Sequence, residues 1–233
     1  MKITRSFRLL AVLILLLFCQ GLIFGQAEKE ALNKTNANGQ KQGEWKVNYP
    51  DGNLRYHGFF ADGKPVGTFQ YYDSTGTLKA VNEFKSNSQT AYHQAFAESG
   101  FVIAKGNFVN QQKDSAWIYY NAADSTLISE ENFQNGTLHG KSITYYANEE
   151  PAEILHYDRG VLQGQWKKYF ANGVLQTAAF YENGQLHGAF VSYHPNGQEH
   201  LSGSYQSGQK IGIWMTYDEE GNILNEDEHK IIE

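Results

Sequence analysis

Two stretches decide the fold: GQWKKYFANGVLQTAAFY, which spans Gly164–Tyr181, and GAFVSYHPNGQEHLSGSY, which spans Gly188–Tyr205. Both have an aromatic residue two positions after the first glycine, a tyrosine five positions after it, a second glycine nine positions after it, and an aromatic residue at the end. In each stretch, two runs rich in apolar and aromatic residues flank a short segment with Asn-Gly. That pattern is typical of two β-strands joined by a turn.

The same unit recurs about eight times along the chain. Its last aromatic residue, the closing aromatic, returns at steps of 24 or 25 residues. A fixed period in this range is typical of an array in which each unit contacts mainly its neighbours. The closing aromatics are Phe60, Phe84, Phe108, Phe133, Tyr157, Tyr181 and Tyr205.

Three more positions define the unit. The leading position is glycine except at Ala91 and Ser115, namely Gly43, Gly67, Gly140, Gly164, Gly188 and Gly212. The second position, two residues later, is aromatic except at His93 and Ser142, namely Trp45, Phe69, Trp117, Trp166, Phe190 and Trp214. The fifth position holds Tyr72, Phe96, Tyr120, Tyr145, Tyr169, Tyr193 and Tyr217, and the first unit has its tyrosine one residue later, at Tyr49.

Each unit is predicted to be one β-hairpin. Asp62-Gly63, Asn135-Gly136 and Asn183-Gly184 are strong hairpin signals, and no stretch beyond the N-terminal segment keeps a helical period over three turns. The fold class is therefore all-β: an elongated antiparallel meander of about eight hairpins, with up to 16 strands. Symmetric closure would place Phe60 opposite Gly67 and Phe84 opposite Ala91, so that a ring covers each small residue.

One detail of the strands stays open. Trp166 and Tyr169 are three residues apart, so a regular strand points them to opposite faces. Either a bulge lies between them or the sheet carries aromatic residues on both faces.

The ends of the chain differ from the repeats. Residues 1–27 place Lys2, Arg5 and Arg8 before an apolar run, as in a secretory signal peptide, and the chain's one cysteine, Cys19, lies there. Residues 28–37 are a polar leader, 38–225 the repeat domain and 226–233 a charged tail. We expect an exported protein, periplasmic or extracellular in a bacterial envelope, with no membrane insertion once the signal is cleaved.

The pattern Gly-x-Trp-x-x-Tyr-x-x-x-Gly-x-Leu, closed by Tyr-x-Asn-Gly, resembles the bacterial variant of the MORN repeat over about residues 38–225. The resemblance implies a curved meander of hairpins. Bacterial proteins of this kind include the antitoxin-like YwqK family, and that likeness implies a neutralising contact with a protein and no catalytic residue.

Charge and motifs narrow the function. Without residues 1–27 the chain has 16 basic and 25 acidic residues, a formal charge of −9, which argues against nucleic acid as a partner. No nucleophile elbow, phosphate loop or dinucleotide fingerprint occurs, so we expect no enzyme activity, no catalytic residue and no cofactor.

Two polar groups are weighed as sites. His194 and His200 flank a predicted turn, with His187 nearby, but the repeat pattern explains His187 and we predict no metal site. The acidic clusters Glu149-Glu150 and Asp218-Glu219-Glu220 fall at predicted turns, where solvation explains them.

The aromatic rows remain as candidate binding residues. They are Trp45, Phe69, Trp117, Trp166, Phe190 and Trp214 at the second position and Tyr169, Tyr193 and Tyr217 at the fifth. They form either the core or an exposed groove, because rings along a groove hold a glycan or an extended peptide. We predict a non-enzymatic binding or scaffolding surface for another protein; the alternative is binding of a glycan or envelope polymer.

Overall fold

The computed structural model describes residues 31–86 and 89–230, and these residues form strands and turns without a helix. The chain divides into two units, Met1–Leu32 and Asn33–Glu233, and the structure concerns the second. The predicted signal peptide and Cys19 lie outside the described residues.

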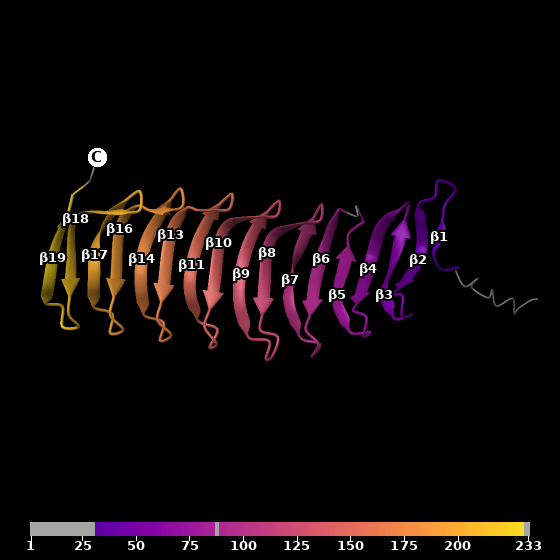
Figure 1. Cartoon of the computed structure of the whole chain (residues 1–233), viewed down its shortest axis with the longest axis horizontal. Coiled ribbons are helices and arrows are strands. Elements are labelled where there is room, and N and C mark those ends of the chain that lie inside the picture. Colours follow the sequence, from indigo (N-terminus) through magenta and orange to yellow (C-terminus); the bar gives the residue numbers. More distant parts are fainter. Residues whose placement is uncertain (1–30, 87–88, 231–233) are drawn as a thin grey trace, which may run out of the picture. The chain divides into compact units, whose positions relative to one another are not determined.

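The strands form one open antiparallel sheet and follow each other in chain order (Figure 1). The first half consists of β1 (Lys34–Thr35), β2 (Lys41–Asn48), β3 (Leu54–Ala61), β4 (Lys64–Tyr72), β5 (Leu78–Phe84), β6 (Thr90–Phe96), β7 (Val102–Val109), β8 (Gln112–Tyr120) and β9 (Leu127–Gln134). The second half consists of β10 (Thr137–Tyr145), β11 (Pro151–Asp158), β12 (Val161–Leu162), β13 (Gly164–Tyr169), β14 (Leu175–Glu182), β15 (Gln185–Leu186), β16 (Gly188–Tyr193), β17 (Glu199–Gln206), β18 (Gln209–Tyr217) and β19 (Ile223–His229).

The predicted number of hairpins is confirmed. Strands β12 and β13 both pair with β11, and β15 and β16 both pair with β14, so each couple is one interrupted strand. When each couple counts once and the two-residue β1 is set aside, the 19 strands occupy sixteen positions, which make eight hairpins.

The turns at the two ends of the strands differ. At one end, two-residue turns such as Asp62-Gly63 and Asn183-Gly184 have both residues at positive φ, as the sequence predicted for these hairpins. At the other end, longer loops close with glycines such as Gly76, whose φ is 87°. There the Asp73 carboxylate accepts hydrogen bonds from the backbone N–H groups of Thr75 and Thr77, which holds the loop.

The leading glycine lies in a β-bulge, and this bulge was not predicted from the sequence. Phe60 lies opposite Gly43 on one side and Pro65 on the other, so the predicted pairing of Phe60 with Gly67 is wrong. The two-residue turn brings Ala61 opposite Lys64, and the register then shifts between His57 and Phe59. Gly67 lies in that bulge at φ 65°, a left-handed conformation that glycine adopts without strain.

The unit that begins at Ala91 shows what happens without this glycine. Its strand β6 pairs with β5 without a register shift, and Phe84 lies opposite Ala91 as predicted. Ala91 has no positive φ, which an L-residue disfavours. This unit has no bulge, and the connection between β5 and β6 is longer than the two-residue turns of the other units.

The sheet is a single layer, and few of its side chains are fully buried. The buried apolar residues of the described chain are Phe69, Ala91, Trp117, Ala179 and Trp214. The sheet also extends past the boundaries expected from sequence. Strand β1 lies within the predicted leader 28–37, and β19 continues to His229 in the predicted tail 226–233, because it pairs with β18 along its length.

Side chains link successive hairpins at the strand ends that carry the longer loops. Tyr49 Oη donates a hydrogen bond of 2.8 Å to the carbonyl oxygen of Tyr72, and Tyr146 Oη donates one of 2.6 Å to that of Tyr169. Asn48 lies opposite Leu54 just as Tyr72 lies opposite Leu78, so Asn48 occupies the fifth position. Tyr49 is therefore the residue after the fifth position and not a displaced fifth-position tyrosine.

Candidate functional site

The second-position residues share one face of the sheet with the closing aromatics. Phe69 makes edge-to-face contacts with Phe60 and Phe84, at centroid distances of 5.1 and 5.2 Å. Trp214 meets Tyr205 in the same way at 5.0 Å. This side, the ring face, is where aromatic residues of successive units touch.

Three of the predicted site residues are fully buried on the ring face, although residues 31–86 and 89–230 form no second layer over it. Phe69, Trp117 and Trp214 each have 2% of their surface exposed. Each ring covers a glycine on the preceding strand: Phe69 covers Gly58, Trp117 covers Gly106 and Trp214 covers Gly203. Ring-over-glycine packing thus exists, but at glycines two residues before the closing aromatic and not at the leading glycines.

The other three second-position rings are half-buried. Trp45 meets Phe60 edge-on at 5.9 Å, and Phe190 meets Tyr205 at 5.6 Å. The indole Nε1 of Trp166 donates a 2.8 Å hydrogen bond to the carboxylate of Glu153. The second-position row is therefore core in some units and accessible surface in others.

The fifth-position tyrosines lie on the opposite face. Tyr169 lines a shallow depression together with Lys167, Gln165 and Ile154, whose side chains alternate with those of the ring face. The bulge in this hairpin lies in the partner strand, where Lys168 faces Thr177 and Tyr169 faces Leu175. Of the two alternatives left open by the sequence, aromatic residues on both faces is the correct one. The half-buried Tyr193 and Tyr217 hold the same position in their units.

Lysines over the rings are a feature that the sequence reasoning missed. Two residues before the leading position lies the cap position, and its occupants are Lys41, Pro65, Gln89, Lys113, Leu138, Leu162, Leu186 and Lys210. The ammonium groups of Lys41, Lys113 and Lys210 lie 4.5, 4.7 and 4.1 Å from the ring centres of Trp45, Trp117 and Trp214. These are cation–π contacts. The spacing Lys-x-x-x-Trp, which occurs three times in the sequence, could have predicted these contacts.

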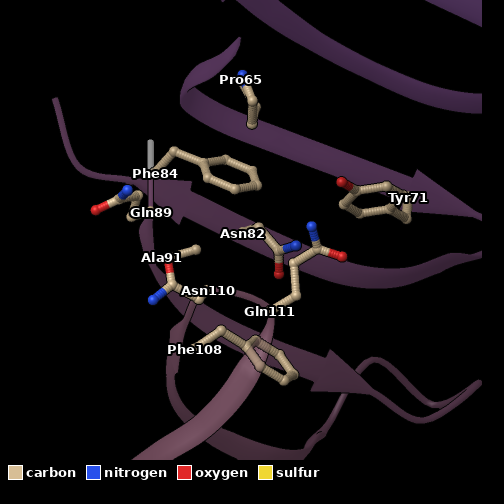
Figure 2. Close-up of a pocket in the computed structure, with 9 residues that line it drawn as sticks. All are labelled: Pro65, Tyr71, Asn82, Phe84, Gln89, Ala91, Phe108, Asn110 and Gln111. Carbon is tan, nitrogen blue, oxygen red and sulfur yellow. The ribbon is translucent and has the colours of Figure 1, made fainter. Parts of the chain in front are cut away.

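The ring face is hollowed over β4 to β7. A cavity of 480 Å³ lies there, and Figure 2 shows the amide ends of Asn82 and Gln111 between the rings of Phe84, Phe108 and Tyr71. The lining is completed by Pro65, Gln89, Ala91 and Asn110. The hollow lies where β6 lacks the bulge of the regular units.

Charges near this cavity come from its neighbours. Burial lowers the pKa of His93, and the positive charge of Lys113 lowers it further. The His93 ring lies 5.2 Å from Phe108, and its Nδ1 lies 2.6 Å from Oδ1 of Asn82. None of the residues lining the cavity is an acid or a base other than Tyr71, whose pKa is raised by burial.

The histidine pair of the C-terminal half lies as the sequence suggested. The rings of His194 and His200 face each other at 4.5 Å. However, His194 Nε2 makes a 2.9 Å hydrogen bond with the carbonyl oxygen of Tyr217, and His187 Nδ1 lies 3.3 Å from the carboxylate of Glu182. Within residues 31–86 and 89–230 no cluster of three metal-ligating side chains occurs.

The comparisons with known proteins support the repeat. The MORN repeat variant matches residues 41–62, 138–159 and 162–183. Each matched segment begins at the cap position and ends at the first residue of the two-residue turn, so it is one complete hairpin of this structure. The three segments are similar to MORN repeats, and they carry no sign of the antitoxin-like family.

The similarity of this chain to solved structures is low. The crystal structure of TarM is 14% identical with a TM-score of 0.24 and aligns over 51% of this chain and 20% of that one. The crystal structure of TcdB2-TccC3-Cdc42 is 13% identical with a TM-score of 0.18 and aligns over 79% and 14%. The chain thus spans a fifth or less of the length of these structures. No curated protein matches the chain. The part of the chain that the structure describes holds no helix able to cross a membrane.

Proposed function

We propose that this chain is an exported, non-enzymatic repeat protein whose ring face binds another protein. The observation that carries the proposal is an aromatic face over which the described residues form no second layer. Sheets normally bury such a face against another element, and an uncovered one marks an interaction surface. Trp45, Trp166 and Phe190 are accessible on it, and the cavity beside Phe84 opens on the same side.

The proposal includes export to the bacterial envelope and an antitoxin-like, neutralising role. The N-terminal charge and apolar pattern of residues 1–27 supports export. The likeness to MORN repeats supports a binding module, because such repeats present surfaces along an array. Cell fractionation of the tagged full-length chain tests the location: recovery from the cytosol alone contradicts export.

A photo-crosslinking experiment in the native cell tests the face that binds. A photoreactive amino acid replaces Gln111, an exposed residue beside the cavity on the ring face, or Phe59, 43% exposed on β3. Because Phe59 lies between Gly58 and the ring-face residue Phe60 in a regular stretch of strand, it lies on the opposite face. We expect a discrete protein adduct from position 111 and none from position 59. Adducts from 59 alone, or from neither, contradict the proposal.

Glycan binding is the second candidate, because accessible rings such as Trp166 and Phe190 stack well on sugar rings. Affinity electrophoresis in gels containing envelope polysaccharide distinguishes the two. Retardation that is lost in the Trp166→Ala variant favours the glycan, whereas unchanged mobility together with an adduct from position 111 favours a protein.

A further inference from the structure

The ammonium group of Lys113 lies in a cage built by its own repeat. It is 4.7 Å from the Trp117 ring centre, 5.0 Å from that of Tyr119 and 5.0 Å from that of Phe133. It also donates a 2.6 Å hydrogen bond to Tyr119 Oη. Aromatic faces around a cation, with one oxygen acceptor, are the arrangement that recognises ammonium groups.

The first repeat builds a similar cage around Lys41, with its tyrosine on the second strand of the hairpin and not on the first. Its ammonium lies 4.5 Å from Trp45, 4.7 Å from Phe60 and 5.7 Å from Tyr56, and it donates a hydrogen bond of 3.1 Å to Tyr56 Oη. The cage is therefore a recurring product of the repeat, and its occupant comes from the cap position.

The unit that begins at Gly67 has the cage without the cation. Phe69 and Tyr71 stand at the same offsets from the leading position as Trp117 and Tyr119 in the unit of Lys113. Phe84 lies opposite Gly67 as Phe133 lies opposite Ser115. The cap residue of this unit is Pro65, which lies opposite Phe60 as Lys113 lies opposite Phe108. Proline supplies no ammonium group.

The next unit lacks the cation as well, because its cap residue is Gln89. In the described chain, leucine takes the cap position in the units closed by Tyr157, Tyr181 and Tyr205, whereas lysine takes it in the units closed by Phe60 and Phe133 and in the last unit, where His229 lies opposite Gly212. Phe84 and Phe108 are closing phenylalanines, so these two units are of the lysine type with the lysine replaced. The 480 Å³ cavity lies at these two neighbouring units, between Phe84, Phe108 and Tyr71.

We propose that this cavity binds the ammonium group of a lysine side chain presented by the partner protein, in the place that Lys41 and Lys113 take in their own units. The inference rests on the proposed function and specifies its contact. Phe84, Phe108 and Tyr71 supply the ring faces, and the Tyr71 hydroxyl oxygen supplies the acceptor, as that of Tyr119 does for Lys113 (Figure 2). The Asn82 amide, whose oxygen lies 2.6 Å from His93 Nδ1, lines the same cavity. The formal charge of −6 on the chain favours a cationic partner over an anionic one.

Titration of the full chain with N-acetyl-lysine methylamide, followed by amide chemical shifts, tests the cavity without the natural partner. We expect saturable shifts confined to residues around Ala91 and Phe108. The norleucine analogue has a similar apolar stem without the charge, and we expect it to give no saturable shift. Equal shifts with norleucine, shifts with a neutral oligosaccharide instead, or none with lysine each overturn the inference.

Substitution of Pro65 supplies the matched variants. Pro65→Lys gives the unit its own ammonium, as in the unit of Lys113, and is expected to abolish the lysine shifts while the protein stays folded. Pro65→Ala leaves the cavity open and is expected to keep them. Tyr71→Phe retains the ring and removes the hydroxyl, and should weaken binding about tenfold, as loss of a hydrogen bond to a charged group does. Full binding by folded Pro65→Lys overturns the inference.

The result is separable from that of the proposed function. The titration detects ligand binding in the cavity alone, whereas the crosslink from position 111 detects any protein bound to the ring face. A protein adduct from position 111 without lysine shifts overturns the ammonium site and leaves the protein-binding face standing. Lysine shifts without any adduct overturn the proposed partner instead.

Discussion

Trp117 covers Gly106 so closely that a Cβ atom on this glycine would lie 2.5 Å from Cδ2 of the indole. Gly106 has no positive φ, so it is not required for its backbone freedom. Among the described glycines, Gly58 and Gly203 share both properties, under Phe69 and Trp214. These three glycines lie under the three fully buried rings of the ring face. Burial in this single layer therefore depends on a flat, side-chain-free strand beneath the ring.

The Gly106→Ala variant should be destabilised although alanine is the better strand residue. The added methyl group meets the body of the Trp117 ring and not a flexible end, and overpacking of this kind costs about 1–3 kcal/mol. Urea unfolding followed by tryptophan fluorescence measures the change. An unfolding midpoint equal to or above that of the unmodified protein would show that the ring moves aside without cost.

Removal of buried and half-buried rings should separate the two roles of the second-position row. Trp117→Ala is expected to cost about 3–5 kcal/mol, as core aromatic truncations do. Trp166→Ala should cost at least about 1 kcal/mol less, because less apolar surface leaves water when that ring packs. The two unfolding curves, recorded under the same conditions, decide it. Equal losses contradict the division of the row into core and accessible rings.

The hairpins were predictable because their determinants are local. Asp62-Gly63 and Asn183-Gly184 specify two-residue turns by backbone preference alone, and the 24-residue period repeats them. The register beside Gly67 was not predictable in this way. Gly67 follows Phe60, and Ala91 follows Phe84, by seven positions. The first segment forms a tight turn and a bulge, whereas the second forms a longer turn without a register shift.

The candidate site was predictable only in part. The aromatic rows were visible in the sequence, but the burial of each ring is decided by the residue beneath it on the preceding strand. That residue is Gly106 under Trp117, whereas Leu155 and Ala179 hold the same place in the hairpins that precede Trp166 and Phe190. The cavity lies at the two units that carry Pro65 and Gln89 in place of a cap lysine. The absence of that lysine gains a meaning only when the structure shows Lys113 inside its cage.

Ser115 should be improved by the residue that other units carry. It occupies the leading position at φ 60°, where Gly43, Gly67 and Gly212 have φ of 67°, 65° and 65°. An L-residue in the left-handed region costs roughly 1–2 kcal/mol relative to glycine, so Ser115→Gly should stabilise the protein by about 1 kcal/mol.

Ala91→Gly is the matched control for Ser115→Gly. Ala91 has an ordinary φ and is buried between the strands of Phe84 and Phe108. Glycine there loses packing and adds backbone freedom to the unfolded chain, so the variant should be less stable by about 1 kcal/mol. Both changes are read as unfolding midpoints. Stabilisation by both substitutions would mean that the leading position favours glycine whatever its φ.

Acid should destabilise the protein through His93. Its pKa is lowered in the folded state by burial and by Lys113, so as the pH falls through about 6.5 the unfolded chain takes up the proton first. The stability that the neutral ring contributes is present above that pH and is lost below it. Protonation would also place a cation 5.6 Å from Trp117, beside the ammonium of Lys113.

His93→Phe isolates this contribution from the other titrating groups, because phenylalanine is the residue at the same position in Phe69 and Phe190. Free energies of unfolding are measured at pH 7.5 and 5.5 for both proteins. We expect a smaller fall in the variant, whatever its absolute stability, since every other histidine and carboxylate is common to both. An identical or steeper fall in His93→Phe would show that His93 is protonated as easily in the folded sheet as in the unfolded chain.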